Sequence, residues 1–146
     1  MLFRSGAARR HAARLAEQAG FDEVAAGRVA LVVTELGNNL LRHAKEGRLL
    51  VAMLRLGDDD WVEVISLDRG PGMHDVKRCL EDGFSTAGTP GTGLGAIRRL
   101  STHFEAFSEW GQGTVIVTRL APRAGMQAPA PAGALQVGGE IGRAHV

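Results

Sequence analysis

The sequence is poor in residues that characterise several classes of protein. Its 146 residues include a single cysteine, Cys79, and no tyrosine. One cysteine cannot form an intramolecular disulfide, so the fold cannot depend on a disulfide framework. No apolar run approaches the roughly 20 residues of a membrane-spanning helix. The N-terminal segment also lacks the apolar core of a signal peptide. We therefore expect a cytoplasmic protein that does not bind membranes.

The chain also lacks an excess of either charge. Its formal net charge is +1, which gives no general electrostatic attraction to nucleic acid or to a membrane surface. The arginines of residues 9–14 have no aromatic residues between them that could stack on bases. We therefore expect no nucleic-acid partner. Hydrophobic residues make up 45% of the chain, a proportion typical of soluble globular domains.

Periodicity and turn residues predict alternating helices and strands followed by an irregular segment. Residues 1–120 contain every periodic segment and are predicted to form one domain. Residues 121–146 are rich in alanine, proline and glycine and are predicted to form a linker or disordered tail. The predicted helices span residues 6–19, 22–45, 75–80 and 96–101, and the predicted strands span 48–56, 61–67, 103–109 and 113–120.

The predicted second helix carries two stripes of side chains. Its apolar stripe has the spacing of one buried helix face and comprises Val29, Val32, Val33, Leu36, Leu40 and Ala44. The polar stripe places Glu35 one turn before Asn39, with Asn38 beside them. Asparagine is a poor residue for the middle of a helix. A carboxylate and a carboxamide suit a base and a Mg²⁺ ligand. A solvated polar face remains the alternative.

Two glycine-rich turns follow in the sequence. Asp68 ends a predicted strand and precedes Gly70 and Gly72. A carboxylate there can accept a hydrogen bond from an exocyclic amine, and the glycines allow a ring to approach the backbone. The series Gly91, Gly93 and Gly95 opens a predicted helix, as phosphate-binding turns do. Each turn taken singly is also compatible with an ordinary glycine turn.

The order and spacing of these segments resemble the GHKL superfamily of ATPases and kinases, whose members include DNA gyrase and histidine kinases. Three segments resemble more closely the small bacterial switch kinases of the RsbT and anti-sigma-factor type, and also the modules found ahead of SpoIIE-type phosphatase domains. They are Thr34-Glu35-Leu36-Gly37-Asn38-Asn39, Glu81-Asp82-Gly83-Phe84-Ser85-Thr86 and Gly93-Leu94-Gly95-Ala96-Ile97-Arg98-Arg99-Leu100.

The resemblance implies a role for individual residues. Asn39 matches the Mg²⁺-binding asparagine, and Glu35 matches the base that orients the attacking hydroxyl. Asp68 matches the aspartate that binds adenine, and residues 81–90 match the ATP lid. The remaining implied nucleotide-binding residues are Gly70, Gly72, Ser85, Thr86, Gly91, Thr92, Gly93, Leu94, Gly95 and Thr114.

The resemblance also implies a fold and a function. The fold is an α/β two-layer sandwich, the Bergerat fold, with a mixed sheet covered by helices on one face. The implied function is serine/threonine phosphorylation of a STAS-domain antagonist, using ATP and Mg²⁺ and leaving ADP, within partner switching that involves a sigma factor or phosphatase. The alternatives are a non-catalytic ATP-binding module associated with a SpoIIE-type phosphatase, and a histidine-kinase-like ATPase domain. Family members often dimerise through a strand before the first helix. Little sequence precedes Arg4 here, so a dimer is possible but not implied.

Overall fold

The computed structural model describes residues 5–43, 46–70 and 93–128. The predicted helix over 75–80 and the predicted lid over 81–90 lie outside the described residues. No helix in the described part of the chain combines the length and the apolarity needed to cross a membrane. In chain order the elements are α1 (Ser5–Gln18), α2 (Glu23–His43), β1 (Arg48–Leu56), β2 (Asp59–Asp68), α4 (Leu94–Leu100), β3 (His103–Glu109) and β4 (Gly113–Leu120).

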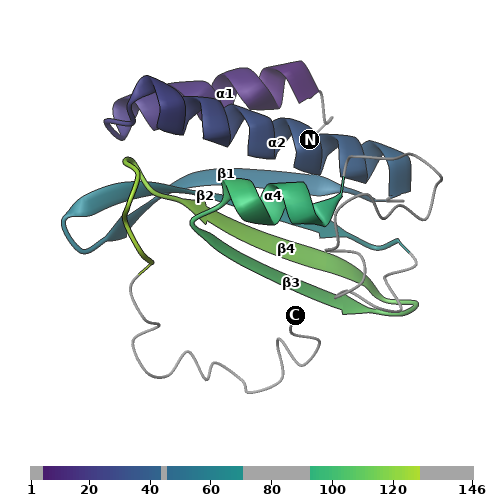
Figure 1. The fold of residues 1–146 in the computed structure, drawn as a ribbon. Coiled ribbons are helices and arrows are strands. Elements are labelled where there is room, and N and C mark those ends of the chain that lie inside the picture. Colours follow the sequence, from purple (N-terminus) through teal and green to yellow (C-terminus); the bar gives the residue numbers. More distant parts are fainter. Residues whose placement is uncertain (1–4, 44–45, 71–92, 129–146) are drawn as a thin grey trace.

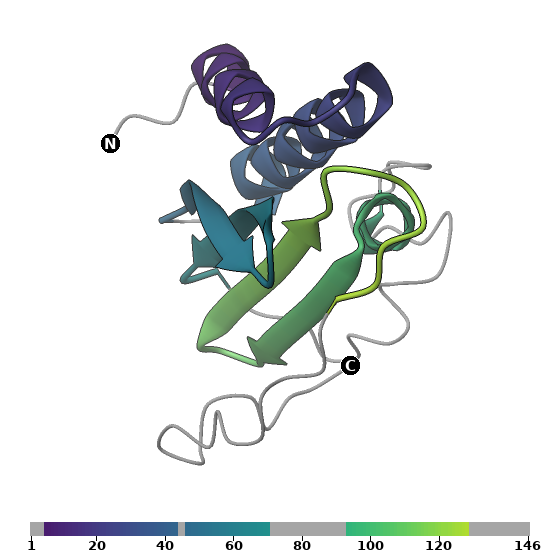
Figure 2. The ribbon, with the colours of Figure 1, turned by 90° about the vertical axis from the view of Figure 1, so that its left-hand side faces the viewer.

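The elements form the predicted two-layer sandwich, in which the helices lie on one face of a four-stranded sheet (Figure 1). Figure 2 shows α1, α2 and α4 gathered on the same side of the sheet. The strand order is β1-β2-β4-β3. One detail differs from the mixed sheet that we expected, because all three pairings in the described sheet are antiparallel. Short turns join β1 to β2 and β3 to β4, and such turns connect antiparallel neighbours.

Local sequence signals set the boundary between α1 and α2. Gly20 has a φ of 79°, a conformation that glycine adopts without steric cost, and it follows the end of α1. The Oδ1 of Asp22 accepts a hydrogen bond from the Ala25 N–H at 2.8 Å, as an N-cap residue does. Gly20 and Asp22 thus separate the end of α1 from the start of α2. Lys45, the predicted end of the second helix, lies outside the described residues.

One apolar core fills the space between the helices and the sheet. Val62 and Val64 of β2 are fully buried, as is Ile97 of α4. Burying a side chain of this size contributes about 1.5–3 kcal/mol. The described members of the predicted apolar stripe of α2 are all buried, namely Val29, Val32, Val33, Leu36 and Leu40. The core therefore fixes which side of α2 faces the sheet.

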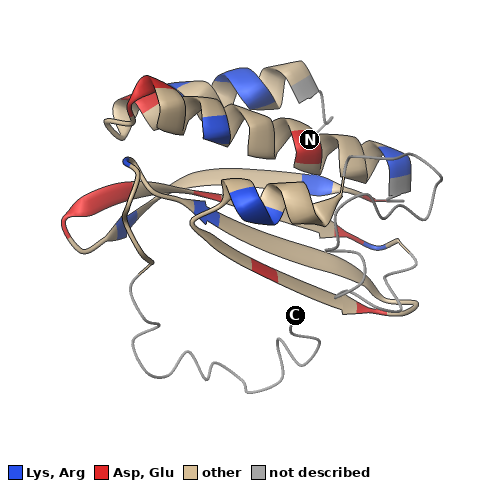
Figure 3. Ribbon diagram, in the orientation of Figure 1, with Lys and Arg blue, Asp and Glu red and all other residues tan. Residues whose placement is uncertain are grey.

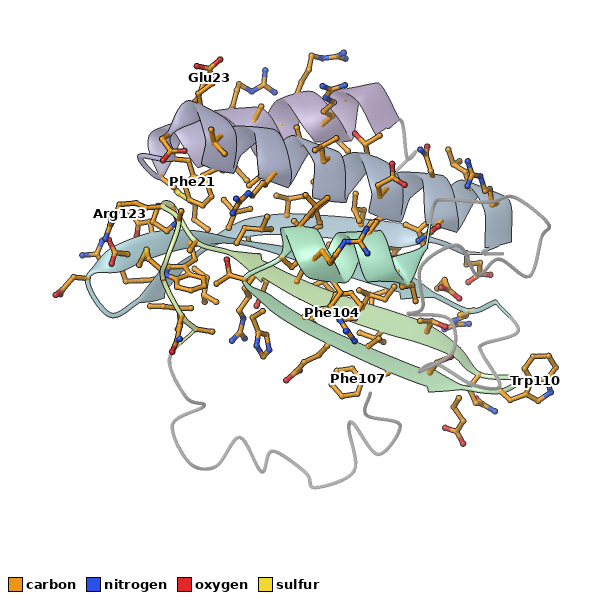
Figure 4. The ribbon with its side chains drawn as sticks, viewed as in Figure 1. Phe21, Glu23, Phe104, Phe107, Trp110 and Arg123 are labelled. Atoms are coloured by element: carbon orange, nitrogen blue, oxygen red, sulfur yellow. The ribbon has the colours of Figure 1, made fainter. Side chains whose placement is uncertain are left out.

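The other face of the sheet is not covered by the described helices. Phe107 lies on this side, below β3 in Figure 4. Glu63 of β2 and Arg119 of β4 are cross-strand partners, and the Arg119 Nε lies 2.9 Å from the Glu63 Oε2. A site bounded by the described helices can therefore form only on the opposite face of the sheet, the one that carries Val62 and Val64.

The chain stays in contact with the sheet after β4. The buried Ala121 donates its N–H to the Thr102 Oγ1 at 3.0 Å. Arg123 lies 3.1 Å from an Asp59 carboxylate oxygen, and Arg55 lies 3.1 Å from Asp60. The first residues of the predicted linker thus contact the domain. The two aspartates that begin β2 are thus each paired with an arginine.

Candidate functional site

The polar stripe of α2 provides the first part of the site. Glu35, Asn38 and Asn39 are all partly buried, whereas the adjacent Leu36 and Leu40 are almost fully buried in the core. Leu36 belongs to the core between the helices and the sheet, so the orientation of the polar stripe is fixed by packing. Residues four apart lie one above the other on a helix. The Glu35 carboxylate and the Asn39 carboxamide can therefore act on the same bound group.

The end of β2 provides the second part. Asp68 is partly buried, and its Oδ1 accepts a hydrogen bond from the Gly70 N–H at 2.8 Å. Gly70 is buried. Asp68 lies on the same face of β2 as Val64, because the two are four residues apart in an extended strand, so its side chain belongs to the side that faces the helices. The hydrogen bond to Gly70 fixes the carboxylate and leaves its second oxygen as an acceptor.

Thr114 and Ser108 extend the row of polar groups across the sheet. Thr114 is the cross-strand partner of both Asp68 and Ser108, so the three side chains lie on one face. The Ser108 Oγ lies 2.9 Å from the Thr114 Oγ1, and it donates to the Gly113 carbonyl at 3.2 Å. Sequence reasoning missed Ser108. The available signal was a hydroxyl two residues after the buried Ala106, at a position that faces the helices.

Gly113 allows the strands to approach each other beside Asp68. Its φ is 125°, and a Cβ built on it would lie 2.1 Å from the Asp68 carbonyl oxygen. It would also lie 3.1 Å from the Arg69 Cα. No side chain fits between these backbones. The position of Asp68 relative to Thr114 therefore depends on a residue that has no side chain.

The start of α4 provides the third part. Gly93 is its N-cap, with extended backbone and no side-chain capping hydrogen bond. Leu94 and Gly95 are buried. Gly93 has no side chain that could cap the first backbone N–H groups of α4. The Ala96 N–H donates to the Gly93 carbonyl at 3.2 Å, which leaves the N–H groups of Leu94 and Gly95 as those that could meet another acceptor. Since α4 has only seven residues, any affinity for phosphate would come from these N–H groups more than from the helix dipole.

The fold brings these three parts to one end of the sandwich. In Figure 1 the C-terminal half of α2, the end of β2, the start of α4 and the start of β4 all lie toward the right. α4 also packs beside α2. The predicted residues that the structure places at this end are Glu35, Asn39, Asp68, Gly70, Gly93, Leu94, Gly95 and Thr114. The predicted residues outside the described part are Gly72, Ser85, Thr86, Gly91 and Thr92.

The donor set at this end fits a nucleotide with Mg²⁺. Among the residues that the structure describes, no group of three or more His, Cys, Asp or Glu could hold a metal ion. Mg²⁺ is commonly bound by one or two protein oxygens, with phosphate oxygens and water completing its octahedron. Asn39, beside Glu35, offers an oxygen ligand of that kind. On the sheet, the fixed Asp68 carboxylate offers an acceptor for an exocyclic amine.

Comparison with known proteins adds an independent result. The model of the histidine kinase-like ATPase domain family matches residues 4–120. The serine/threonine-protein kinase RsbT of Bacillus subtilis (strain 168) is 34% identical over 110 residues, which make up 75% of this chain and 83% of that protein. A mycobacterial sensor histidine kinase, MprB, aligns with a TM-score of 0.48 at 20% identity, over 67% of this chain and 74% of that one. The family match spans all the described site residues.

Proposed function

Because the chain belongs to the family of histidine kinase-like ATPase domains, we propose that it is an ATP- and Mg²⁺-dependent serine/threonine kinase. Its proposed substrate is a STAS-domain antagonist protein in a partner-switching pathway. The relative named as a serine/threonine-protein kinase supports this proposal, since the alignment covers 83% of that protein. It also supports a protein rather than a small molecule as the phosphate acceptor.

One structural observation carries the proposal. Glu35 and Asn39 lie one turn apart on α2, toward the same end of the fold as the row formed by Asp68 and Thr114. The row on the sheet has groups that can form hydrogen bonds with the adenine base of a nucleotide. The helix has the groups for phosphates and for an attacking hydroxyl. A nucleotide bound between the two layers would therefore present its phosphates to Glu35 and Asn39.

Each residue would have a separate role in phosphoryl transfer. Asn39 would hold the metal ion, which when bound offsets the charge of the phosphates. Glu35 would accept a hydrogen bond from the acceptor hydroxyl and orient its oxygen for in-line attack. The N–H groups at the start of α4 would bind phosphate oxygens, where negative charge lies in the transition state. Asp68 would hold the adenine base of ATP in place and would thereby set the distance between the phosphates and Glu35.

Phosphoryl transfer to purified partners tests the proposal. The chain should transfer label from γ-labelled ATP to a serine or threonine of a STAS-domain protein from the same organism. Each STAS-domain protein is assayed singly, beside a calorimetric titration with ADP and Mg²⁺. Nucleotide binding without labelling of any of them would reject the kinase and leave the non-catalytic ATP-binding module in its place. Absence of nucleotide binding would reject both.

Asp68→Asn should weaken the binding of ADP by about 1–3 kcal/mol, the usual cost of leaving a buried partner unsatisfied. The substitution keeps the size of the side chain and an oxygen that can accept from the Gly70 N–H, so the backbone should keep its position. Isothermal titration calorimetry measures the change. Asp58→Asn is the matched control, because Asp58 is an exposed residue of the turn before β2. Equal ADP affinity for the wild type and Asp68→Asn would remove Asp68 from the site.

A further inference from the structure

A second feature of α2 is a stripe of exposed and partly buried residues that includes the proposed base. Its members are spaced alternately four and three apart, which places them along one side of the helix. We refer to Val24, Arg28, Leu31, Glu35, Asn38 and Arg42 as the outer stripe. None of them belongs to the buried face that contacts the sheet. The outer stripe therefore follows the surface of α2 from its first turn to its last.

The N-terminal half of the outer stripe carries two exposed apolar side chains, one on each side of Arg28, where a solvated helix would carry polar ones. Val24 is 68% exposed and Leu31 is 50% exposed. Single exposed apolar residues are common on protein surfaces, but these two lie two turns apart on the same side of one helix. Leu31 also lies one turn before Glu35, so an exposed apolar side chain adjoins the proposed base directly.

The position of Leu31 bears on how a protein substrate would approach. A hydroxyl that reaches Glu35 must come within hydrogen-bonding distance of its carboxylate. When that hydroxyl belongs to a folded protein, the surrounding surface must cover part of α2 as well. The next turn toward the N-terminus presents Leu31. Apolar surface there would be removed from water only when the acceptor protein is in place, which favours the complex.

The charges beside the apolar residues indicate the chemistry of the partner. Arg28 is exposed between Val24 and Leu31. α4 packs beside α2 and adds the exposed Arg98. Figure 3 shows the basic positions of α2 and, below them, those of α4. Glu23 is the other acidic residue of α2, and it points away from the sheet and from α4, at the top of Figure 4. A complementary surface would therefore carry an apolar side chain with carboxylates beside it.

We propose that the outer stripe is the docking surface for the phosphate-accepting protein. On this proposal an apolar side chain of the acceptor packs on Val24 and Leu31, and one or more carboxylates face Arg28. Docking on these residues brings the acceptor hydroxyl to Glu35. The inference rests on the kinase function proposed above and adds to it the face by which the substrate protein is held.

The first test compares two leucines of the same helix. Leu31→Ala should raise the KM for the STAS-domain substrate about tenfold, the effect of losing one interface anchor, while ADP affinity stays at the wild-type value. Leu41→Ala is the matched control, because Leu41 is 64% exposed on α2 but lies off the outer stripe. Alanine favours a helix in both variants, so neither should unfold α2. Equal KM values for the two variants would overturn the proposal.

The second test concerns charge and contact. Arg28→Glu should raise the KM for the protein substrate more than Leu31→Ala does, and Arg28→Lys should restore most of the loss. With p-benzoylphenylalanine in place of Leu31, the purified STAS-domain substrate should be photo-crosslinked. The same probe in place of Leu41 should give little product. Crosslinking only at position 41 would place the acceptor elsewhere. If the wild type labels no STAS-domain protein, the kinase proposal fails; if it labels one that these changes do not affect, only the docking surface fails.

Discussion

Glu35→Ala is expected to keep ATP binding and to lose phosphoryl transfer by about 10²–10⁴-fold, the usual contribution of a general base. The hydrogen bond that Glu35 would make to the acceptor hydroxyl gains most of its strength in the transition state, so the ground-state complex with ATP changes little. Asn39→Ala is expected to lose both transfer and Mg²⁺-dependent binding. Its side chain would contact the metal ion before and during the reaction.

The two variants are compared by labelling of the STAS-domain substrate and by titration with ATP in the presence and absence of Mg²⁺. Asn38→Ala is the control for binding, since it removes a neighbouring asparagine from the same helix and raises helix propensity to the same degree. It should bind Mg²⁺ and ATP as the wild type does. Transfer by Glu35→Ala at the wild-type rate would show that another group, or none, acts as the base.

Gly113→Ala is expected to lower the free energy of unfolding by about 2–4 kcal/mol and to weaken ADP binding. The new Cβ would lie 2.1 Å from the Asp68 carbonyl oxygen, with backbone rather than a movable side chain in its way. Either β4 moves away from β2 or the φ of 125° changes. Both adjustments displace Asp68 relative to Thr114, so stability and nucleotide binding should fall together.

Gly111→Ala separates backbone strain from close packing. Gly111 also has a positive φ, of 82°, but a Cβ there would meet nothing within 4 Å. Its replacement should cost only the strain of a left-handed residue, about 1–2 kcal/mol, and should leave ADP affinity unchanged. Chemical denaturation and calorimetry on both variants make the comparison. Equal losses of stability, with ADP affinity unchanged in both, would contradict the role given to Gly113.

Much of the fold follows from local signals in the sequence. The strands of the second hairpin have the predicted bounds, His103–Glu109 and Gly113–Leu120. Two segments of strand-forming residues flank one short turn there, and this pattern predicts a hairpin clearly. The apolar spacing of α2 predicts its buried face correctly, since a helix has one way to place such residues against a core. The family resemblance also follows from residues that are near one another in the sequence, and the family match to residues 4–120 confirms it.

By itself, the sequence determined the elements of the described part of the chain, the buried side of α2 and the family, and it supplied the residues that we propose to bind ATP. Only the tertiary structure decided that Ser108 contacts Thr114, that Gly113 packs on the Asp68 backbone, and that Leu31 stays exposed beside Glu35. The physical reason is the range of the interactions. Helix and strand periods depend on neighbours a few residues apart. The contact of Gly113 with Asp68 depends on the pairing of β2 with β4, strands far apart in the chain. The exposure of Leu31 likewise depends on which surfaces of α2 the other elements cover.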